Sequence, residues 1–299
     1  MSGALLAAAR EALAPIRNLY PFEPRFHVHG DVVQHYLDEG PRDGEVLFCV
    51  HGNPTWSFYW RELVRRARES YRVIAPDHVG CGLSDKPQDY PYTLEQHVQN
   101  LVALVDALEI ERCTLVLHDW GGAIGMGWAS RNEEAVRRLV ILNTAAFRSK
   151  RIAFSIGLCR IPGFGALCIR GMNAFARAAV IRAAKTRLPA DVIRGYLGPY
   201  DSWAHRIANL RFVQDIPMHS GVPSWPVLAE IEDRLPRFRD RPMLICWGGA
   251  DFCFDDSFLD GWKARFPGAE VHRFAEAGHY VLEDAGPQVI EHMTCLLYT

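Results

Sequence analysis

The sequence lacks a cysteine pair at metal-binding or redox spacing, a long uncharged hydrophobic run, and an excess of charge of either sign. Its 299 residues carry 33 Lys and Arg against 35 Asp and Glu. The resulting formal net charge of −2 gives no general reason to bind nucleic acid. Phosphate-binding loops, dinucleotide-binding glycine motifs and zinc-ligand spacings are also absent. We therefore expect no cofactor, no metal and no nucleic-acid partner.

The eight cysteines are scattered along the chain, and none forms a C-x-x-C pair. Cys49, Cys113 and Cys246 lie inside apolar runs that are typical of central strands, where a free cysteine behaves as a small hydrophobe. Residues 1–16 are rich in Ala and Leu but lack the basic start and the cleavage site of a secretory leader. We therefore expect reduced thiols, a cytoplasmic location and a short amphipathic helix at the start of the chain.

Short apolar runs alternate with helical stretches through most of the chain. Residues 46–50 form a continuous apolar run, whereas 93–110 has apolar residues at helical spacing. This alternation is typical of a parallel sheet covered by helices on both faces. We predict an α/β fold with a mostly parallel eight-stranded sheet. The strands that the pattern locates are 32–37, 46–50, 71–75, 114–117, 139–142, 243–247 and 271–274, and the helices are 56–70, 93–110, 120–130, 258–266 and 287–297.

Residues 147–226 break this alternation, because they are helical in composition and interrupted by Pro and Gly. We predict a helical cap inserted over the carboxyl ends of the strands, between core segments 1–146 and 227–299. Residues 151–226 hold ten basic and three acidic side chains, a charge of +7 that leaves −9 for the rest of the chain. Such a charge fits a solvated helical face as well as it fits docking to an acidic partner, a membrane surface or an anionic substrate.

One predicted strand-to-helix junction carries a reactive side chain. The apolar run 115–117 leads directly into His118, Asp119, Trp120 and two glycines, which is the context of a nucleophile elbow. The turn residue is Asp rather than Ser, and a carboxylate can displace a leaving group from carbon to form a covalent ester. We predict that Asp119 is a nucleophile rather than an N-cap of the following helix.

Two further residues complete a set in the chain order nucleophile, acid, histidine. Asp251 follows the penultimate predicted strand, and His279 follows the last one. We predict that Asp251 is the acid and His279 the base. The rival acids Asp255 and Asp256 stand at a helix start, where we expect them to act as caps, and Asn143 at the end of an earlier strand cannot serve as a carboxylate.

The loop after strand 46–50 has the sequence HGNPTW at 51–56, and this loop supplies the oxyanion hole of a hydrolase elbow. Asn53 offers a side-chain amide, and Trp120 offers an indole N–H beside the nucleophile. Two N–H groups that converge in an apolar pocket would hold a leaving anion or an oxyanion. The alternative is a purely structural turn.

These motifs together resemble those of haloalkane dehalogenases. The resemblance rests on HGNPT at 51–55, APD at 75–77 with G-x-G-x-SDKP at 80–87, and HDWGG at 118–122. It extends from about residue 20 to residue 297, and it implies the α/β-hydrolase fold.

The same resemblance implies roles for individual residues. Asp119, His279 and Asp251 match the family's nucleophile, base and acid, while Asn53 and Trp120 match the residues that hold the halide. The position of the acid and the basic, apolar cap are similar to a branch of the family, the β-lactone decarboxylases of bacterial long-chain olefin biosynthesis. Those enzymes act on cis-3,4-dialkyl oxetan-2-ones and work in an assembly with neighbouring pathway enzymes.

Two reactions fit this set of residues. In β-lactone decarboxylation, Asp119 attacks a strained ring ester, and a cis-alkene and CO2 leave. In the alternative, haloalkane dehalogenation, Asp119 displaces halide and His279 activates water to hydrolyse the alkyl-enzyme ester. The first reaction needs an apolar channel for two alkyl chains of a small apolar substrate. We expect cap residues such as Phe154, Ile156, Leu158, Ile161, Phe164, Leu167 and Ile169 to line it.

Three other functions are less favoured. Epoxide hydrolysis needs acidic cap hydroxyls, for which only Tyr196 and Tyr200 are available, and epoxide hydrolases typically carry an aromatic residue where Asn53 stands. A non-catalytic binding protein is disfavoured by the intact catalytic set. Residues 152–169 contain Arg160 and four helix breaks, one proline and three glycines, which argue against a spanning helix. Peripheral membrane contact remains open.

Overall fold

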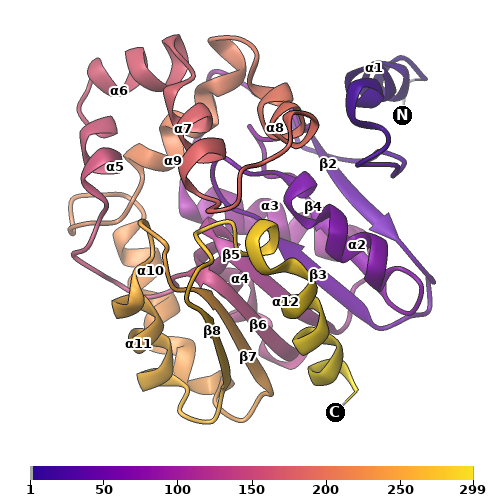
Figure 1. Cartoon of the computed structure of the whole chain (residues 1–299), viewed down its shortest axis with the longest axis vertical. Helices are drawn as coiled ribbons and strands as arrows, with labels where there is room; N and C mark the ends of the chain where they lie inside the picture. Colours follow the sequence, from indigo (N-terminus) through magenta and orange to yellow (C-terminus); the bar gives the residue numbers. More distant parts are fainter. Residues whose placement is uncertain (1–2, 299) are drawn as a thin grey trace.

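The computed structural model describes residues 3–298, which fold into one eight-stranded sheet with helices on both faces (Figure 1). The spatial order of the strands is β1-β2-β4-β3-β5-β6-β7-β8. β1 pairs antiparallel with β2 and β2 antiparallel with β4, whereas all other neighbours are parallel. The predicted fold class is therefore confirmed. The strands are β1 (Arg25–His29), β2 (Val32–Glu39), β3 (Val46–Val50), β4 (Arg72–Pro76), β5 (Cys113–Asp119), β6 (Val136–Thr144), β7 (Met243–Gly248) and β8 (Glu270–Phe274).

The central strand β5 is buried along its whole length, and its side chains alternate between two hydrophobic layers. Leu115 and Leu117 face one layer, and Val116 faces the other. The first layer contains α3 (Leu94–Ala107), α4 (Trp120–Ala129), α10 (Trp225–Arg234) and α11 (Asp256–Arg265). The second contains α1 (Gly3–Leu13), α2 (Arg61–Ala67) and α12 (Val281–Leu297).

The register of the parallel strands aligns the ends that carry the predicted site. Val50 at the end of β3 is level with Leu117 of β5, and Asp119 is level with Thr144 of β6. The segments that follow these strands therefore open on the same edge of the sheet, where ligands bind in α/β folds.

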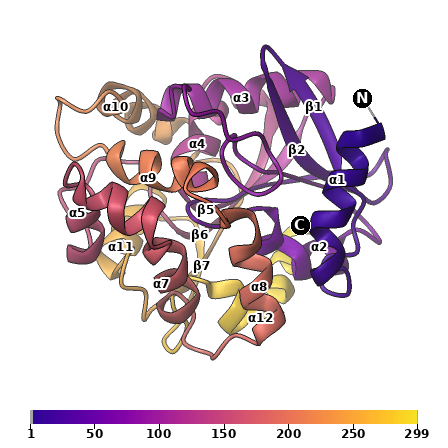
Figure 2. The ribbon, with the colours of Figure 1, turned by 90° about the horizontal axis from the view of Figure 1, so that it is seen from above.

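Five helices between β6 and α10 lie over this edge, as the view from above shows (Figure 2). Inner side chains of α7 and α8, including Ala179 and Tyr196, belong to the same hydrophobic layer as α12. Ile156 of α5 and Leu210 of α9 form a small cluster of their own. The division into a core of 1–146 and 227–299 and a cap of 147–226 stays a prediction. The helices are α5 (Phe154–Cys159), α6 (Phe164–Ala166), α7 (Ala174–Arg182), α8 (Ala190–Leu197) and α9 (Ile207–Gln214), with a π-helical turn at Leu167–Gly171 between α6 and α7.

The helix boundaries differ from the predicted ones at two places. The segment expected as one helix at 56–70 is a 3-10 turn, Ser57–Trp60, followed by the short helix α2. The last helix begins at Val281, six residues earlier than expected, and is broken by a non-helical Ala285 two positions before Pro287. Because Pro287 has no backbone N–H to donate to the preceding turn, a kink at Ala285 allows the helical segments before and after it to form.

Candidate active site

Asp119 occupies the junction between β5 and α4 with no intervening loop. Its backbone has φ 52° and ψ −128°, a region that side-chain-bearing residues rarely adopt. Close packing of the helix start maintains this turn. A Cβ on Gly121 would lie 2.0 Å from the carbonyl oxygen of Val50, and a Cβ on Gly52 would lie 2.0 Å from Oδ1 of Asp119. The glycines thus let two chain segments, the loop after β3 and the elbow itself, approach closely around one buried carboxylate.

The two oxygens of the Asp119 carboxylate have different partners. The backbone N–H of Asn53 donates to Oδ1 at 2.6 Å. Oδ2 lies 3.5 Å from Nε2 of His279. The hydroxyl of Thr144 donates to the backbone carbonyl oxygen of Asp119 and so ties the elbow to β6. One oxygen is therefore anchored to the chain, while the other faces the histidine.

His279 is held from its far side by Asp251. Nδ1 of His279 lies 2.8 Å from Oδ2 of Asp251, and all three members of the predicted set are buried. The structure thus brings Asp119, His279 and Asp251 together in the predicted order. Asp255 is the N-cap of α11, where its side chain accepts from Ser257, as expected.

Asn143 is a supporting residue that the sequence did not reveal. Its Nδ2 donates to Oδ2 of Asp251 at 3.0 Å and to the carbonyl oxygen of Gly248 at 3.0 Å, while its Oδ1 accepts from the backbone N–H of Gly248 at 2.7 Å. Oδ1 of Asp251 accepts from the backbone N–H of Cys253 at 2.6 Å. These bonds fix the orientation of the carboxylate that holds His279.

The charges of the site are interdependent. Burial alone would lower the pKa of His279, but the carboxylates of Asp251 and Asp119 raise it to about 10. Burial would raise the pKa of Asp119, but the contacts with His279 and the N–H of Asn53 hold it below its usual value. At neutral pH the site therefore contains an imidazolium between two carboxylates. Esterification of Asp119 would remove one of these negative charges and lower the pKa of His279.

Asn53 and Trp120 both line the cavity above Asp119. Nδ2 of Asn53 donates to the backbone carbonyl of Asn209 at 3.2 Å, which fixes the amide while leaving its second hydrogen for a ligand. The indole of Trp120 is half-buried and packs 5.2 Å from the ring of Phe212. Their role in holding an anion stays a prediction that this placement favours.

The cavity has a volume of about 370 Å³ and is mainly apolar. Asp119 and His279 form its floor, and side chains of the cap region such as Ile152, Phe175 and Met218 form its walls. The predicted list of channel residues is only partly correct. Ile156, Leu158 and Phe164 line the cavity; Phe154, Ile161 and Leu167 point to solvent instead, and Ile169 is buried among the cap helices.

The two cap tyrosines lie outside the cavity lining. The hydroxyl of Tyr196 donates to Glu283, and that of Tyr200 lies 3.4 Å from the carbonyl oxygen of Thr55. Burial raises the pKa of both hydroxyls well above the usual value. They are therefore not placed to protonate an epoxide above Asp119.

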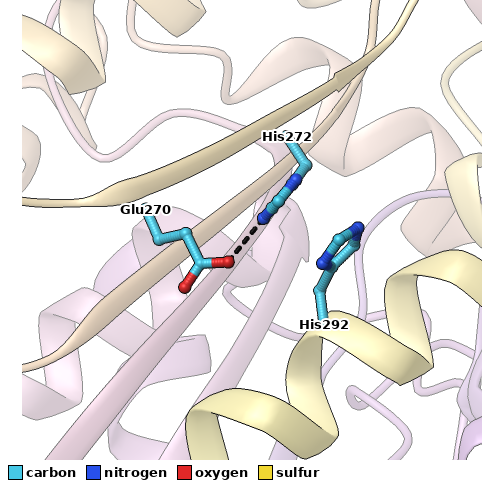
Figure 3. Close-up of side chains that lie close together, drawn as sticks. All are labelled: Glu270, His272 and His292. Atoms are coloured by element: carbon cyan, nitrogen blue, oxygen red, sulfur yellow. Dashed lines mark hydrogen bonds and ion pairs between the residues drawn. The ribbon is translucent and has the colours of Figure 1, made fainter.

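Three residues of metal-ligating type lie together elsewhere, although their sequence spacing did not predict it (Figure 3). Glu270 and His272 come from β8 and His292 from α12, and Nε2 of His272 lies 2.5 Å from Oε1 of Glu270. The two imidazole rings stack with centroids 3.4 Å apart and 17° between their planes. Nearly parallel rings direct their in-plane lone pairs side by side rather than at one point, so this arrangement does not form a shared metal site.

Comparisons with known proteins agree with the geometry. Residues 45–286 match the family model described as alpha/beta hydrolase fold. The chain therefore belongs to the α/β-hydrolase fold family, in which it is similar to haloalkane dehalogenase-like proteins. The structure superimposes on that of haloalkane dehalogenase DatA of Agrobacterium tumefaciens with a TM-score of 0.81 and 27% sequence identity. The match covers 92% of this chain and 96% of DatA.

Two curated relatives are considerably more similar in sequence. The chain is 46% identical to the cis-3-alkyl-4-alkyloxetan-2-one decarboxylase of Shewanella oneidensis, over 92% of this chain and 88% of the relative. It is also 46% identical to the protein of the same name from Xanthomonas campestris, over 89% of this chain and 92% of the relative.

Proposed function

We propose that this protein is a β-lactone decarboxylase, which converts cis-3-alkyl-4-alkyl-oxetan-2-ones to cis-alkenes and CO2 in long-chain olefin biosynthesis. The observation that carries the proposal is the buried Asp119 carboxylate, paired with His279 at the floor of an apolar cavity. The two decarboxylase relatives at 46% identity support the choice of substrate. Sequence and site thus favour a small apolar lactone.

The first step opens the ring. The carboxylate of Asp119 attacks C4 of the oxetan-2-one from the side opposite the ring oxygen, and the C4–O bond breaks with inversion. The bonding electrons leave on the carboxylate that remains attached to C3. Asn53 and Trp120, which line the cavity together with Asp119, donate hydrogen bonds to this new anion, as does the imidazolium of His279.

The second step releases both products. The bond between C3 and the carboxylate breaks, its electrons form the C3=C4 double bond, and the C4–O bond to Asp119 returns its electron pair to the aspartate. Elimination of groups that lie anti to one another, after one inversion, keeps the two alkyl groups cis. The two steps together consume no water and are redox-neutral. Asp119 is regenerated directly when the C4–O bond breaks.

Haloalkane dehalogenation is the second candidate, because it uses the same residues and the fold matches a haloalkane dehalogenase. In that reaction His279 must be neutral to activate water. That requirement arises only after Asp119 is esterified, when one of the two carboxylates that raise the pKa of His279 has lost its charge. The decarboxylation needs His279 only as a hydrogen-bond donor.

Product analysis separates the two reactions. The purified protein is incubated in parallel with a long-chain cis-β-lactone and with 1-bromobutane, and alkene and bromide are quantified. We expect alkene from the lactone at a rate that exceeds bromide release at least a hundredfold, and no alkene from Asp119→Ala. Bromide release without alkene would replace the decarboxylase proposal with the dehalogenase.

Two interactions of the cap region remain predictions: assembly with neighbouring pathway enzymes and peripheral membrane contact. Among the ten basic residues of 151–226, all of which the structure describes, only Arg151 forms an ion pair, with Asp255 at 2.7 Å. The remaining positive charge is therefore available to an acidic protein or to anionic lipid.

A further inference from the structure

Exposed large hydrophobic side chains gather on one part of the molecule. Of the ten such side chains in residues 3–298, eight lie between residues 154 and 203. We call these eight the cap surface: Phe154, Leu158, Ile161, Phe164, Leu167, Met172, Ile181 and Trp203. An apolar surface of this kind marks a binding site when its residues adjoin one another.

The elements that carry the cap surface are neighbours in space. α5 contacts α6, α6 contacts the π-helical turn, and this turn contacts α7. Gly171 lies close to both Leu167 and Trp203, so residues more than thirty positions apart meet there. In Figure 2, α5 and α7 lie on the same side of the molecule, away from α1, α2 and the N-terminus.

All charged side chains in residues 151–190, which carry seven of the eight residues of the cap surface, are basic. Residues 151–190 contain seven Lys and Arg and no Asp or Glu. Arg160 and Arg177 have no carboxylate within ion-pair distance in the described part of the chain. The guanidinium of Arg170 lies 4.6 Å from the ring centre of Trp203, so basic and apolar groups are interleaved rather than separated.

The cap surface also adjoins the entrance of the cavity above Asp119. Leu158 and Phe164 are exposed and at the same time line the cavity. A molecule bound against the cap surface is therefore next to an apolar route toward the nucleophile.

We propose that the cap surface docks on an anionic lipid bilayer, from which the cavity takes its apolar substrate. The docking rests on the surface itself, whereas the identity of the substrate rests on the proposed function. A bilayer matches both features, because its headgroups attract arginine and its acyl region accepts the protruding Phe154 and Leu167. A long-chain substrate dissolved in the bilayer then reaches Asp119 without crossing water.

The mode of binding is peripheral. Among the described helices no single one is long and apolar enough to cross a membrane, and the one pair that passes together, Phe164–Gly171 with Ala174–Arg182, is bent by 69°. The inner face of this pair, including Ile169 and Val180, is buried in the protein. Only its outer face remains for the interface.

The test measures co-sedimentation of the full chain with vesicles of phosphatidylcholine alone and of phosphatidylcholine with phosphatidylglycerol. The test variant is Phe154→Glu with Leu167→Glu, at side chains 82% and 59% exposed that do not line the cavity. The matched control is Val28→Glu with Tyr298→Glu, at side chains 58% and 80% exposed outside the cap surface. Both variants add two negative charges to exposed apolar positions.

We expect the unmodified protein to bind the anionic vesicles, and to bind neutral vesicles at least tenfold more weakly. The test variant should lose tenfold or more in binding, whereas the control variant should bind within about twofold of the unmodified protein. Raising the salt concentration should weaken binding, since part of the attraction is electrostatic. Absence of binding to anionic vesicles, or equal loss in both variants, overturns the proposal.

Two readouts separate this proposal from its alternatives. The unmodified protein and the control variant could fail to bind vesicles but form a larger assembly that the test variant does not form. In that case the cap surface binds protein, and the bilayer proposal is wrong. Turnover of a short, water-soluble β-lactone is measured in both variants and should be unchanged. Vesicle binding without lactone turnover would refute the proposed function alone, and turnover without vesicle binding would refute the docking alone.

Discussion

Nε2 of His279 lies 3.5 Å from Oδ2 of Asp119, with no hydrogen bond of ordinary length joining the two side chains. The other ring nitrogen is bound much more closely to Asp251, at 2.8 Å. The histidine is thus fixed by Asp251 and only faces Asp119. In the proposed reaction this spacing leaves the Asp119 carboxylate free to attack carbon, while the imidazolium stays close to the charge that develops.

The role of Asp119 is tested by Asp119→Ala. We expect turnover of the lactone to be abolished, because no other carboxylate lines the floor of the cavity. The fold should persist, since the strained backbone at φ 52° is held by packing of Gly121 rather than by the side chain. Steady-state alkene formation and a thermal unfolding curve check both points. Substantial turnover by the folded variant would remove the covalent mechanism.

The anion-binding role of Asn53 is tested by Asn53→Ala. Loss of one preorganised donor typically lowers the rate by about 10²–10³. The matched control is Asn132→Ala, which removes a side-chain amide that donates to the carbonyl oxygen of Trp128 at the end of α4, away from the cavity. The control should keep its rate within about twofold. Equal rates in the two variants would make the loop at 51–56 a structural turn.

Asn143 provides a test of how Asp251 is held. Asn143→Leu removes the donor to Oδ2 of Asp251 and should lower kcat roughly tenfold, since a hydrogen bond to a charged group is worth about 1.5–3 kcal/mol. The pKa of His279 should also change in the variant, because the carboxylate oxygen of Asp251 that faces Nδ1 of His279 loses a hydrogen-bond donor. A pH titration of His279 by NMR checks this shift. An unchanged titration together with a normal kcat would show that Asn143 only packs against Gly248.

The raised pKa of His279 predicts how stability depends on pH. The histidine titrates near 6.5 in the unfolded chain and at about 10 in the folded protein. The resulting stabilisation is fully present below pH 6.5 and is lost as pH rises toward 10. From the size of the shift it is on the order of 5 kcal/mol. Urea unfolding of the protein and of His279→Gln at several pH values between 6.5 and 9.5 measures the difference.

In that series, the free energy of unfolding of the unmodified protein should fall relative to that of His279→Gln as pH rises. Asp119→Asn is the companion variant, because it removes one of the two carboxylates that favour the imidazolium. The free energy of unfolding that Asp119→Asn gains from the protonated His279 should therefore be lost at a lower pH than in the unmodified protein. A constant difference between the unmodified protein and His279→Gln across the range would contradict the ion-paired resting site.

The grouping of Asp119, Asp251 and His279 was predictable because it depends on topology alone. Asp119, Asp251 and His279 each follow a strand, and the carboxyl ends of neighbouring parallel strands meet at one edge of a sheet. The same periodicity located most strands. It missed β1, whose sequence RFHVH alternates between polar and apolar residues on an edge strand and has no continuous apolar run.

Other features depend on packing that the sequence does not state. The contact of Asn143 with Asp251 requires β6 and β7 to be adjacent, although roughly one hundred residues separate them in the chain. In the cap region the helices are short, so their apolar residues do not form one continuous stripe. Whether Phe154 points to solvent and Ile156 into the cavity is therefore decided by tertiary contacts.

In the proposed reaction, Asp119 opens a β-lactone that then collapses to an alkene without the participation of water. The most direct measurement is the reaction of a long-chain cis-β-lactone in water enriched in ¹⁸O, with the alkene and any 3-hydroxy acid quantified by mass spectrometry. We expect one cis-alkene for each lactone consumed and no labelled hydroxy acid. A 3-hydroxy acid labelled at its hydroxyl oxygen as the main product of multiple turnovers would contradict this, because that oxygen comes from an Asp119 carboxylate that water has regenerated by hydrolysing the ester.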